Sequence, residues 1–144
     1  MRYLPLLLFT LIISSCKNKN SYGSAEGEKL PKDFIEFYEK FHKDTAFQKA
    51  HCIFPMQGLP DQADSTVNAS TFRWTEANWN YHKELNLPPS FHREFSTFGP
   101  EMIIERILDD KQGIGMERRW VKFGKEWSLF YYVGMNQFSK NKKG

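Results

Sequence analysis

The sequence predicts an α+β domain in which N-terminal helices pack on an antiparallel sheet, and three observations support this prediction. First, aromatic residues recur at the i, i+3, i+4, i+7 spacing of an amphipathic helix, at Phe34, Phe37, Tyr38 and Phe41. Second, the last third of the chain contains three β-rich runs, EMIIERILDD, IGMERRWVKF and EWSLFYYVGM. Third, Gly124-Lys125 separates the last two runs, and a glycine at the first central position suits a two-residue type II′ hairpin.

Residues 1–15 have the composition of a secretory signal. Arg2 supplies the positive charge, and the apolar core at residues 4–13 is shorter than the roughly 20 apolar residues that span a bilayer. Ser14 and Ser15 then place two small residues before Cys16. This junction resembles the lipobox of bacterial lipoproteins, which implies cleavage before Cys16 and acylation of its thiol. Two or more acyl chains would give a stable membrane anchor.

The chain therefore divides into four parts: a lipoprotein signal peptide at 1–15, lipidated Cys16 with a flexible polar tether at 16–29, a single domain at 30–138 and a basic tail at 139–144. We expect a protein of the bacterial cell envelope that is anchored to the membrane through Cys16. Lys17, rather than an aspartate, follows the cysteine, and by resemblance to enterobacterial sorting rules this favours the outer membrane. Loss of the signal leaves a near-neutral chain, and export argues against a nucleic-acid partner.

Two short helices and one strand are expected in the first half of the domain. Pro31 suits the first turn of the helix that carries the aromatic stripe, and Asp44 offers an N-cap for a second helix. The segment HCIFPMQG is expected to form a strand that ends at Gly58, while LPDQADSTVNAS and NLPPSF are expected to be loops. The segment TFRWTEANWNYHKEL fits either a strand or a helix.

Cys52 has no partner cysteine in the chain, because Cys16 is assigned to lipid. Its apolar sequence context indicates a buried thiol, with an intermolecular disulfide or a reactive thiol as the alternatives. The histidines have no metal-ligand spacing, and we expect no metal or other cofactor. Asp64-Ser65 and Asp44-Thr45 resemble O-glycosylation sites of some anaerobic gut bacteria, and the sequence does not decide whether either is used.

The turn at Gly124-Lys125 predicts a register for the last hairpin. It pairs Phe123 with Glu126, Lys122 with Trp127, Trp120 with Leu129 and Arg118 with Tyr131. One face is then expected to pack against the helices and carries Ile114, Met116, Arg118, Trp120, Trp127, Leu129, Tyr131, Val133 and Met135. The other face mixes charged and aromatic side chains, from Glu117, Arg119, Val121, Ser128, Phe130 and Tyr132.

Helices followed by a long antiparallel sheet with a terminal F-G-K-x-W-x-L-F hairpin resemble the nuclear transport factor 2-like superfamily, also called the cystatin-like cone. The segments FIEFYEKFHKDTAFQKAHCIFP and WVKFGKEWSLFYY also resemble a family of bacterial lipoproteins assigned to this fold. The resemblance implies a curved sheet over which the helices close to form a pocket. Some members of the superfamily are dehydratases, isomerases or cyclases, and many others bind ligands or dimerise without chemistry.

We expect a non-catalytic module that binds a small apolar ligand or an envelope protein, with a dehydratase-, isomerase- or cyclase-type enzyme as the alternative. The pocket candidates are Glu105, Arg118, Trp120 and Tyr131. The sequence does not decide whether Glu105 or Arg106 faces inward. A buried Arg–Glu or Arg–Tyr pair needs no catalytic role, because a buried charge must find a partner. No catalytic residue is assigned, since an enzyme would need an ionisable group with a tuned pKa in the pocket.

The other face of the predicted hairpin offers a surface for association. The interface candidates are Arg119, Val121, Phe130 and Tyr132, and aromatic residues and arginine are the types that interfaces favour. The resemblance implies pairing through this face, so we expect a homodimer in which Arg119 of one chain reaches Glu117 of the other. The alternative is that a terminal segment or the loop at 59–70 covers the patch within one chain.

Overall fold

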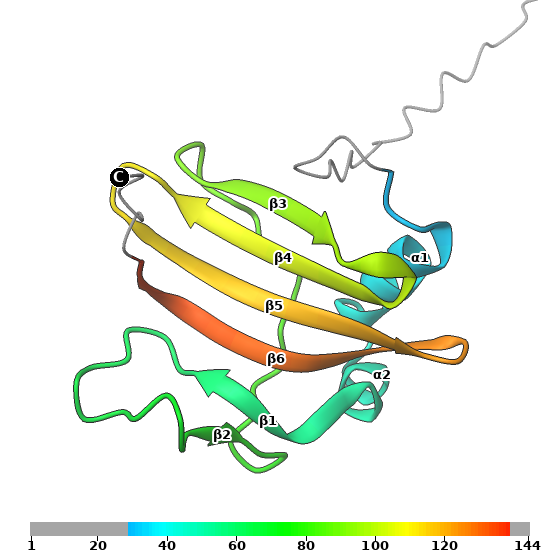
Figure 1. Cartoon of the computed structure of the whole chain (residues 1–144), viewed down its shortest axis with the longest axis horizontal. Coiled ribbons are helices and arrows are strands. Elements are labelled where there is room, and N and C mark those ends of the chain that lie inside the picture. Colours follow the sequence, from blue (N-terminus) through cyan, green and yellow to red (C-terminus); the bar gives the residue numbers. More distant parts are fainter. Residues whose placement is uncertain (1–28, 139–144) are drawn as a thin grey trace, which may run out of the picture.

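The computed structural model describes residues 29–138 as two helices and one six-stranded sheet (Figure 1). The elements follow the order α1 (Lys32–Phe41), α2 (Thr45–Ala50), β1 (Cys52–Leu59), β2 (Arg73–Trp74), β3 (His92–Thr97), the 3-10 turn η1 (Gly99–Glu101), β4 (Met102–Asp109), β5 (Ile114–Phe123) and β6 (Glu126–Gln137). The predicted signal peptide, Cys16, residues 17–28 of the tether and the basic tail at 139–144 lie outside the described residues.

Both predicted helices are present. The four aromatic residues of the stripe on α1 are all buried, as the helical spacing predicted. Pro31 is the N-cap residue of α1, one position before the helix begins. Asp44 caps α2, and its Oδ1 accepts a hydrogen bond from the backbone N–H of Phe47 at 3.0 Å. The caps and the apolar spacing together account for where both helices start and which side they bury.

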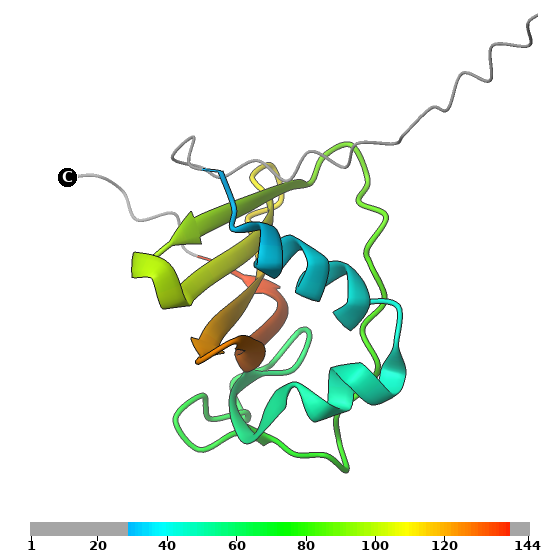
Figure 2. The same cartoon turned by 90° about the vertical axis from the view of Figure 1, so that its right-hand side faces the viewer.

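The sheet has the strand order β2-β1-β6-β5-β4-β3 and is curved, with both helices on one of its faces (Figures 1 and 2). Four of its five strand pairs are antiparallel, and β1 runs parallel to β6. The three β-rich runs form β4, β5 and β6, as predicted. No sequence pattern indicated β3 or the parallel pair. The fold class is therefore α+β with a mostly antiparallel curved sheet.

A bulge in β6 shifts the predicted register of the last hairpin. Gly124 has a φ of 61°, as a type II′ turn requires, and the predicted pairs hold from the turn to Trp120–Leu129. Beyond that point Arg119 lies opposite Tyr131 and Arg118 opposite Tyr132. The predicted pairing of Arg118 with Tyr131 is therefore wrong. One extra residue in a strand reverses the side on which the following side chains point. A second register shift lies between Val133 and Asn136.

The consequence of the bulge is visible in the burial of the two tyrosines. Tyr132 is 6% exposed and faces the helices, whereas Tyr131 is half-buried on the opposite face. The predicted faces were thus correct for Trp120 and Trp127 but reversed for Tyr131 and Tyr132. Val133 was also predicted to face the helices, but it pairs with Glu117 on the opposite face and lines a hollow there.

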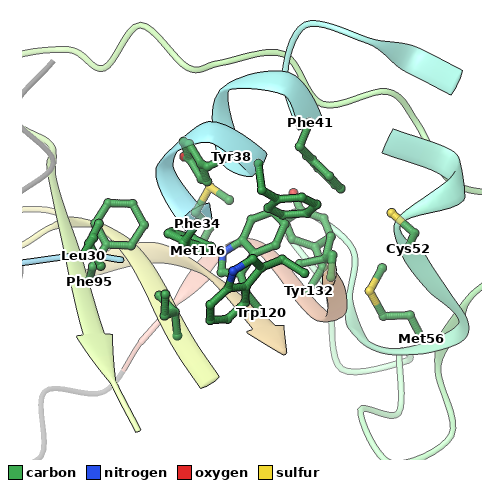
Figure 3. Close-up of a cluster of buried hydrophobic side chains, with 14 of the residues drawn as sticks. Leu30, Phe34, Tyr38, Phe41, Cys52, Met56, Phe95, Met116, Trp120 and Tyr132 are labelled. Carbon is green, nitrogen blue, oxygen red and sulfur yellow. The ribbon is translucent and has the colours of Figure 1, made fainter. Parts of the chain in front are cut away.

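Trp120 lies at the centre of the core between α1 and the sheet (Figure 3). It is fully buried and makes edge-to-face contacts with Phe34 at 6.0 Å and Phe41 at 4.9 Å between ring centroids. Trp127 packs edge-to-face on Phe34 at 5.1 Å and donates its indole N–H to Asp33 at 3.1 Å. These contacts fix α1 against β5 and β6.

The segment 75–91, which the sequence left ambiguous in its first part, is irregular and runs on the helix side of the sheet (Figure 2). Gln48 of α2 holds it in place. The Gln48 amide donates to the carbonyls of Phe41 at 2.9 Å and His82 at 2.8 Å, and its oxygen accepts from the His82 N–H at 2.8 Å and the Trp79 indole at 3.2 Å. These four bonds use both donors and both acceptor sites of the Gln48 amide. They position His82 over the inner face of the sheet.

Candidate functional site

A carboxylate lies in the interior of the domain. Glu105 on β4 is 0% exposed and shares the inner face with Ile103 and Ile107. Its Oε1 accepts a 2.6 Å hydrogen bond from the hydroxyl of Tyr38. The alternative left open by the sequence is thereby decided, because Arg106 lies on the opposite face of the sheet, where its Nε donates to Glu117 at 2.8 Å. An ionised carboxylate in such a place requires partners of opposite charge.

Two guanidinium groups supply that charge. Arg118 on β5 lies directly across from Glu105, and its Nη1 donates to Oε2 at 3.3 Å. Arg93 on β3 approaches from the other neighbouring strand, with its Nε 3.3 Å from Oε1. Its side chain is 15% exposed, whereas that of Arg118 is 2% exposed. One carboxylate is therefore shared between two cations.

Two histidines contact the guanidinium of Arg118. Nε2 of His42 lies 3.1 Å from Nη1, and Nδ1 of His42 lies 2.8 Å from the carbonyl oxygen of Tyr38. The carbonyl can only accept, so Nδ1 carries the proton and Nε2 accepts from Arg118. Nδ1 of His82 lies 3.5 Å from Nη2. The Nε atom of Arg118 is buried and has no hydrogen-bond partner among residues 29–138.

The histidines and tyrosines around Arg118 are held in their neutral forms. Burial, reinforced by the charge of Arg118, lowers the pKa of His42 to about 4 and that of His82 to about 3. Burial raises the pKa of Tyr132 to about 12 and that of Tyr38 well above its usual value. Burial is the largest influence on the pKa of Arg118 and lowers it, but Glu105, Tyr38 and Tyr132 together outweigh burial, and the pKa of Arg118 is raised.

A cleft of about 470 Å³ reaches this cluster from the surface, and we call it the Arg118 cleft. The deeply buried Arg118 and Tyr132 line it together with His82, and most of its other lining residues are aromatic or apolar, namely Trp74, Tyr81, Leu85, Met116 and Met135. Asn80, Asp61 and Lys83 contribute polar and charged groups. The volume and the mixture of apolar walls with few polar groups are typical of small-molecule sites.

The structure separates the four predicted pocket candidates. Arg118 lines the cleft, and Glu105 lies behind it as its ion-pair partner. Trp120 belongs to the packed core, and Tyr131 lies on the opposite face of the sheet because of the bulge. Tyr132 takes the position that was predicted for Tyr131.

Sequence reasoning missed the two histidines and Tyr38 as parts of this cluster. Tyr38 belongs to the aromatic stripe, which indicates burial but not a polar partner. His82 lies in a loop, and the residue that places it there, Gln48, is far from it in sequence. Gln48 is the buried residue of α2, and no sequence spacing indicated that this polar side chain turns inward.

Of the four interface candidates, Arg119 belongs to a polar network on the opposite face of β5 and β6, and Val121 and Phe130 are half-buried. Glu117 accepts from Arg119 at 2.7 Å as well as from Arg106, and the Arg119 guanidinium lies 4.2 Å from the ring centre of Tyr131. A hollow of about 330 Å³ lies there. Tyr132, predicted for this face, is instead turned inward. Glu117 lies across from Val133 rather than Tyr132, and Arg119 lies across from Tyr131 rather than Phe130.

Cys52 is a buried free thiol, as predicted, and burial raises its pKa to about 12. A thiol with this pKa is almost entirely protonated at neutral pH and is a poor nucleophile. Within residues 29–138, no group of three or more histidine, cysteine, aspartate or glutamate side chains is arranged to hold a metal ion.

No model of a known protein family matches the sequence, and no curated protein matches it either. Of the helices in the described part of the chain, none has the length and apolar character needed to span a membrane.

Proposed function

We propose that this protein is a lipid-anchored protein of the bacterial cell envelope whose domain binds a small molecule in the Arg118 cleft without changing it chemically. The junction Ser14-Ser15-Cys16 after an apolar core supports the anchor. The helices over one face of a curved sheet are compatible with the cone of the nuclear transport factor 2-like superfamily, in which ligands bind between these two layers. We propose membership of that superfamily on this basis.

One observation carries the binding proposal: an open cleft ends at a buried guanidinium. Arg118 already has an ion-pair partner, and a purely structural pair would be expected to be closed off by apolar side chains. Instead, the cleft leads to Arg118 between aromatic walls. A few polar groups at the end of an apolar cleft can orient a ligand, while the walls supply the buried area.

The pKa values around the cleft support binding rather than general acid–base catalysis. An effective general base has a pKa near the working pH, whereas the pKa values of His42 and His82 lie near 4 and 3. The pKa of Tyr132 is displaced in the opposite direction, to about 12. These three groups stay neutral through the physiological range and serve as hydrogen-bonding and packing groups.

A thermal-shift screen of a small-molecule library tests this function. The sample is the chain from residue 16 onward with Cys16→Ser, which we call the unlipidated chain because it needs no detergent. Asn80→Trp adds a bulky ring to the wall of the cleft, and Asn86→Trp is the matched control in the same loop, outside the cleft. Both positions are exposed.

The proposal predicts compounds that raise the melting temperature of the parent and of Asn86→Trp but not of Asn80→Trp. Compounds that stabilise Asn80→Trp equally would place binding elsewhere and contradict the proposal. Turnover of a bound compound, detected by mass spectrometry after incubation, would favour the enzyme alternative.

A further inference from the structure

We propose that the ligand of the Arg118 cleft carries a single carboxylate, which binds the Nε–Nη2 edge of Arg118, and a flat apolar body, which packs against the aromatic walls. This inference rests on the proposed function and adds the chemical class of the ligand. It follows from the charge balance of the cluster, from the hydrogen-bond inventory of Arg118 and from the shape of the cleft.

The charge balance leaves one positive charge without a counter-charge. Arg118 and Arg93 share one carboxylate, that of Glu105. The two other charged residues that line the cleft, Asp61 and Lys83, have opposite signs and cancel. The neutral histidines add nothing to this balance. A buried excess charge is costly, so a monoanion that enters the cleft is favoured.

The donors of Arg118 are used unevenly. Nη1 donates toward both Glu105 and His42. On the opposite edge of the guanidinium, and within the described part of the chain, Nε has no hydrogen-bond partner and Nη2 has only a 3.5 Å contact to His82. Two parallel N–H groups on one edge match the two oxygens of a carboxylate.

His82 marks the side from which the ligand arrives. His82 lines the cleft and its Nδ1 lies 3.5 Å from Nη2, so the Nη2 end of the free edge lies next to a residue of the cleft wall. The backbone of His82 is held by Gln48, but its side chain makes only the long contact to Arg118 and ring contacts with Trp79 and Tyr132. A carboxylate can replace that long contact through rotation of the ring.

The walls favour a flat body. Tyr132 packs at 5.5 Å from Trp74 and at 4.5 Å from His82, and all three residues line the cleft with Arg118. Aromatic rings add offset or edge-to-face contacts to the area that they bury. A phosphate monoester carries about −1.5 to −2 charges at pH 7 and would exceed the single excess charge, whereas a carboxylate balances it.

The test compares three probes that share one ring system: 2-naphthoate, neutral 2-naphthamide and 2-naphthyl phosphate. Binding to the unlipidated chain is measured by NMR titration. We expect 2-naphthoate to bind at least tenfold more tightly than either of the other probes. Arg118→Lys keeps the positive charge beside Glu105 but removes the two parallel N–H donors of the Nε–Nη2 edge. It is expected to abolish most of the difference in affinity between 2-naphthoate and the other probes. Arg106→Lys, on the opposite face, is the matched control and should leave it unchanged.

The outcomes separate this inference from the proposed function. Equal binding of naphthoate and naphthamide, blocked in both cases by Asn80→Trp, would overturn the carboxylate class and leave the cleft as a binding site. Tightest binding of the phosphate, or binding of none of the probes, would also overturn the carboxylate class. If Arg118→Lys still binds 2-naphthoate more tightly than the other probes, Arg118 is not the residue that selects the carboxylate, and the inference is wrong. The thermal-shift screen tests the proposed function independently of these three probes.

Discussion

Glu105 and Arg118 face each other on neighbouring strands in the interior, with Arg118 Nη1 3.3 Å from Glu105 Oε2. Both side chains are almost completely buried, and the carboxylate also holds Arg93 and the hydroxyl of Tyr38. The pair therefore links α1, β3, β4 and β5 at one point. It also places a cation at the end of the Arg118 cleft, so stability and binding depend on the same residues.

Glu105→Gln should destabilise the domain strongly. It removes the carboxylate that contacts both guanidinium groups, and breaking a buried ion pair by removing one partner costs about 3–5 kcal/mol. Urea unfolding of the unlipidated chain measures this change. Glu36→Gln is the matched control, because Glu36 forms an exposed helix pair with Lys32 and such pairs contribute less than about 1 kcal/mol. Similar losses in the free energy of unfolding for the two variants would contradict the conclusion that Glu105 stabilises the buried arginines.

Trp127→Ala should lower the free energy of unfolding by about 3–5 kcal/mol, the usual cost of truncating a buried tryptophan. Trp127 is 2% exposed and packs on Phe34. Phe123→Ala, at the exposed end of the same hairpin, should change stability by less than about 0.5 kcal/mol. A denaturant melt compares them, and a loss under about 1 kcal/mol for Trp127→Ala would show that the ring is not part of the core.

The stability of the domain should fall as the pH is lowered from about 6.5 toward 5. The pKa values of His42 and His82 are lowered to about 4 and 3 by burial and Arg118, whereas an unfolded histidine has a pKa of about 6.5. In this window the unfolded state binds more protons, so acid favours unfolding, by up to about 1.4 kcal/mol per pH unit for each histidine.

Urea melts between pH 6.5 and 5 measure the slope, and His82→Asn should reduce it. The ring proton signals of His42 and His82 in NMR spectra should not titrate between pH 8 and 5. Titration of either signal near pH 6.5 would contradict the burial and contacts described for it.

The unlipidated chain is expected to dimerise at micromolar concentrations through the face that carries Arg119, Val121, Phe130 and, after correction, Tyr131. Arginine and aromatic residues favour interfaces, and a two-fold axis would bring Arg119 near Glu117 of the other chain. Analytical ultracentrifugation should show a dimer that Phe130→Glu weakens. Phe123→Glu, at the exposed hairpin tip, should leave it unchanged. A monomer at all concentrations tested would refute the interface.

Cys16→Ala should abolish lipid attachment in the producing bacterium. The thiol of Cys16 is the expected acylation site, and cleavage is expected directly before it. Metabolic labelling with a clickable fatty acid should mark the parent but not the variant, which should accumulate as an unprocessed precursor. Equal labelling of the two proteins would mean that the junction is not a lipoprotein signal.

Local features of the sequence predicted local structure well. The spacing of Phe34 and Phe41 predicted the buried side of α1, and Gly124 predicted the turn and the pairs nearest to it. Such signals act over a few residues, where spacing alone decides which side chains share a side. The strand β3 has only Phe95 as a large apolar residue, so its pattern did not identify it.

Features that depend on contacts between distant parts of the chain could not be predicted from such spacings. The parallel pairing of β1 with β6 joins segments far apart in the chain, without a short turn to indicate it. The bulge next to Leu129 lies inside a continuous β-rich run, where strict alternation predicts the wrong side for Tyr131. His82 reaches Arg118 only because Gln48 holds the loop, so the site depends on a contact that no sequence spacing indicates.

The most direct test of the binding proposal is a crystal structure of the unlipidated chain with the compound that stabilises it most in the screen. We expect density for the compound in the Arg118 cleft, with a polar atom hydrogen-bonded to the Arg118 guanidinium and its apolar part against Tyr132. A compound bound elsewhere on the protein, with the cleft unoccupied, would contradict the proposal that the cleft is the binding site.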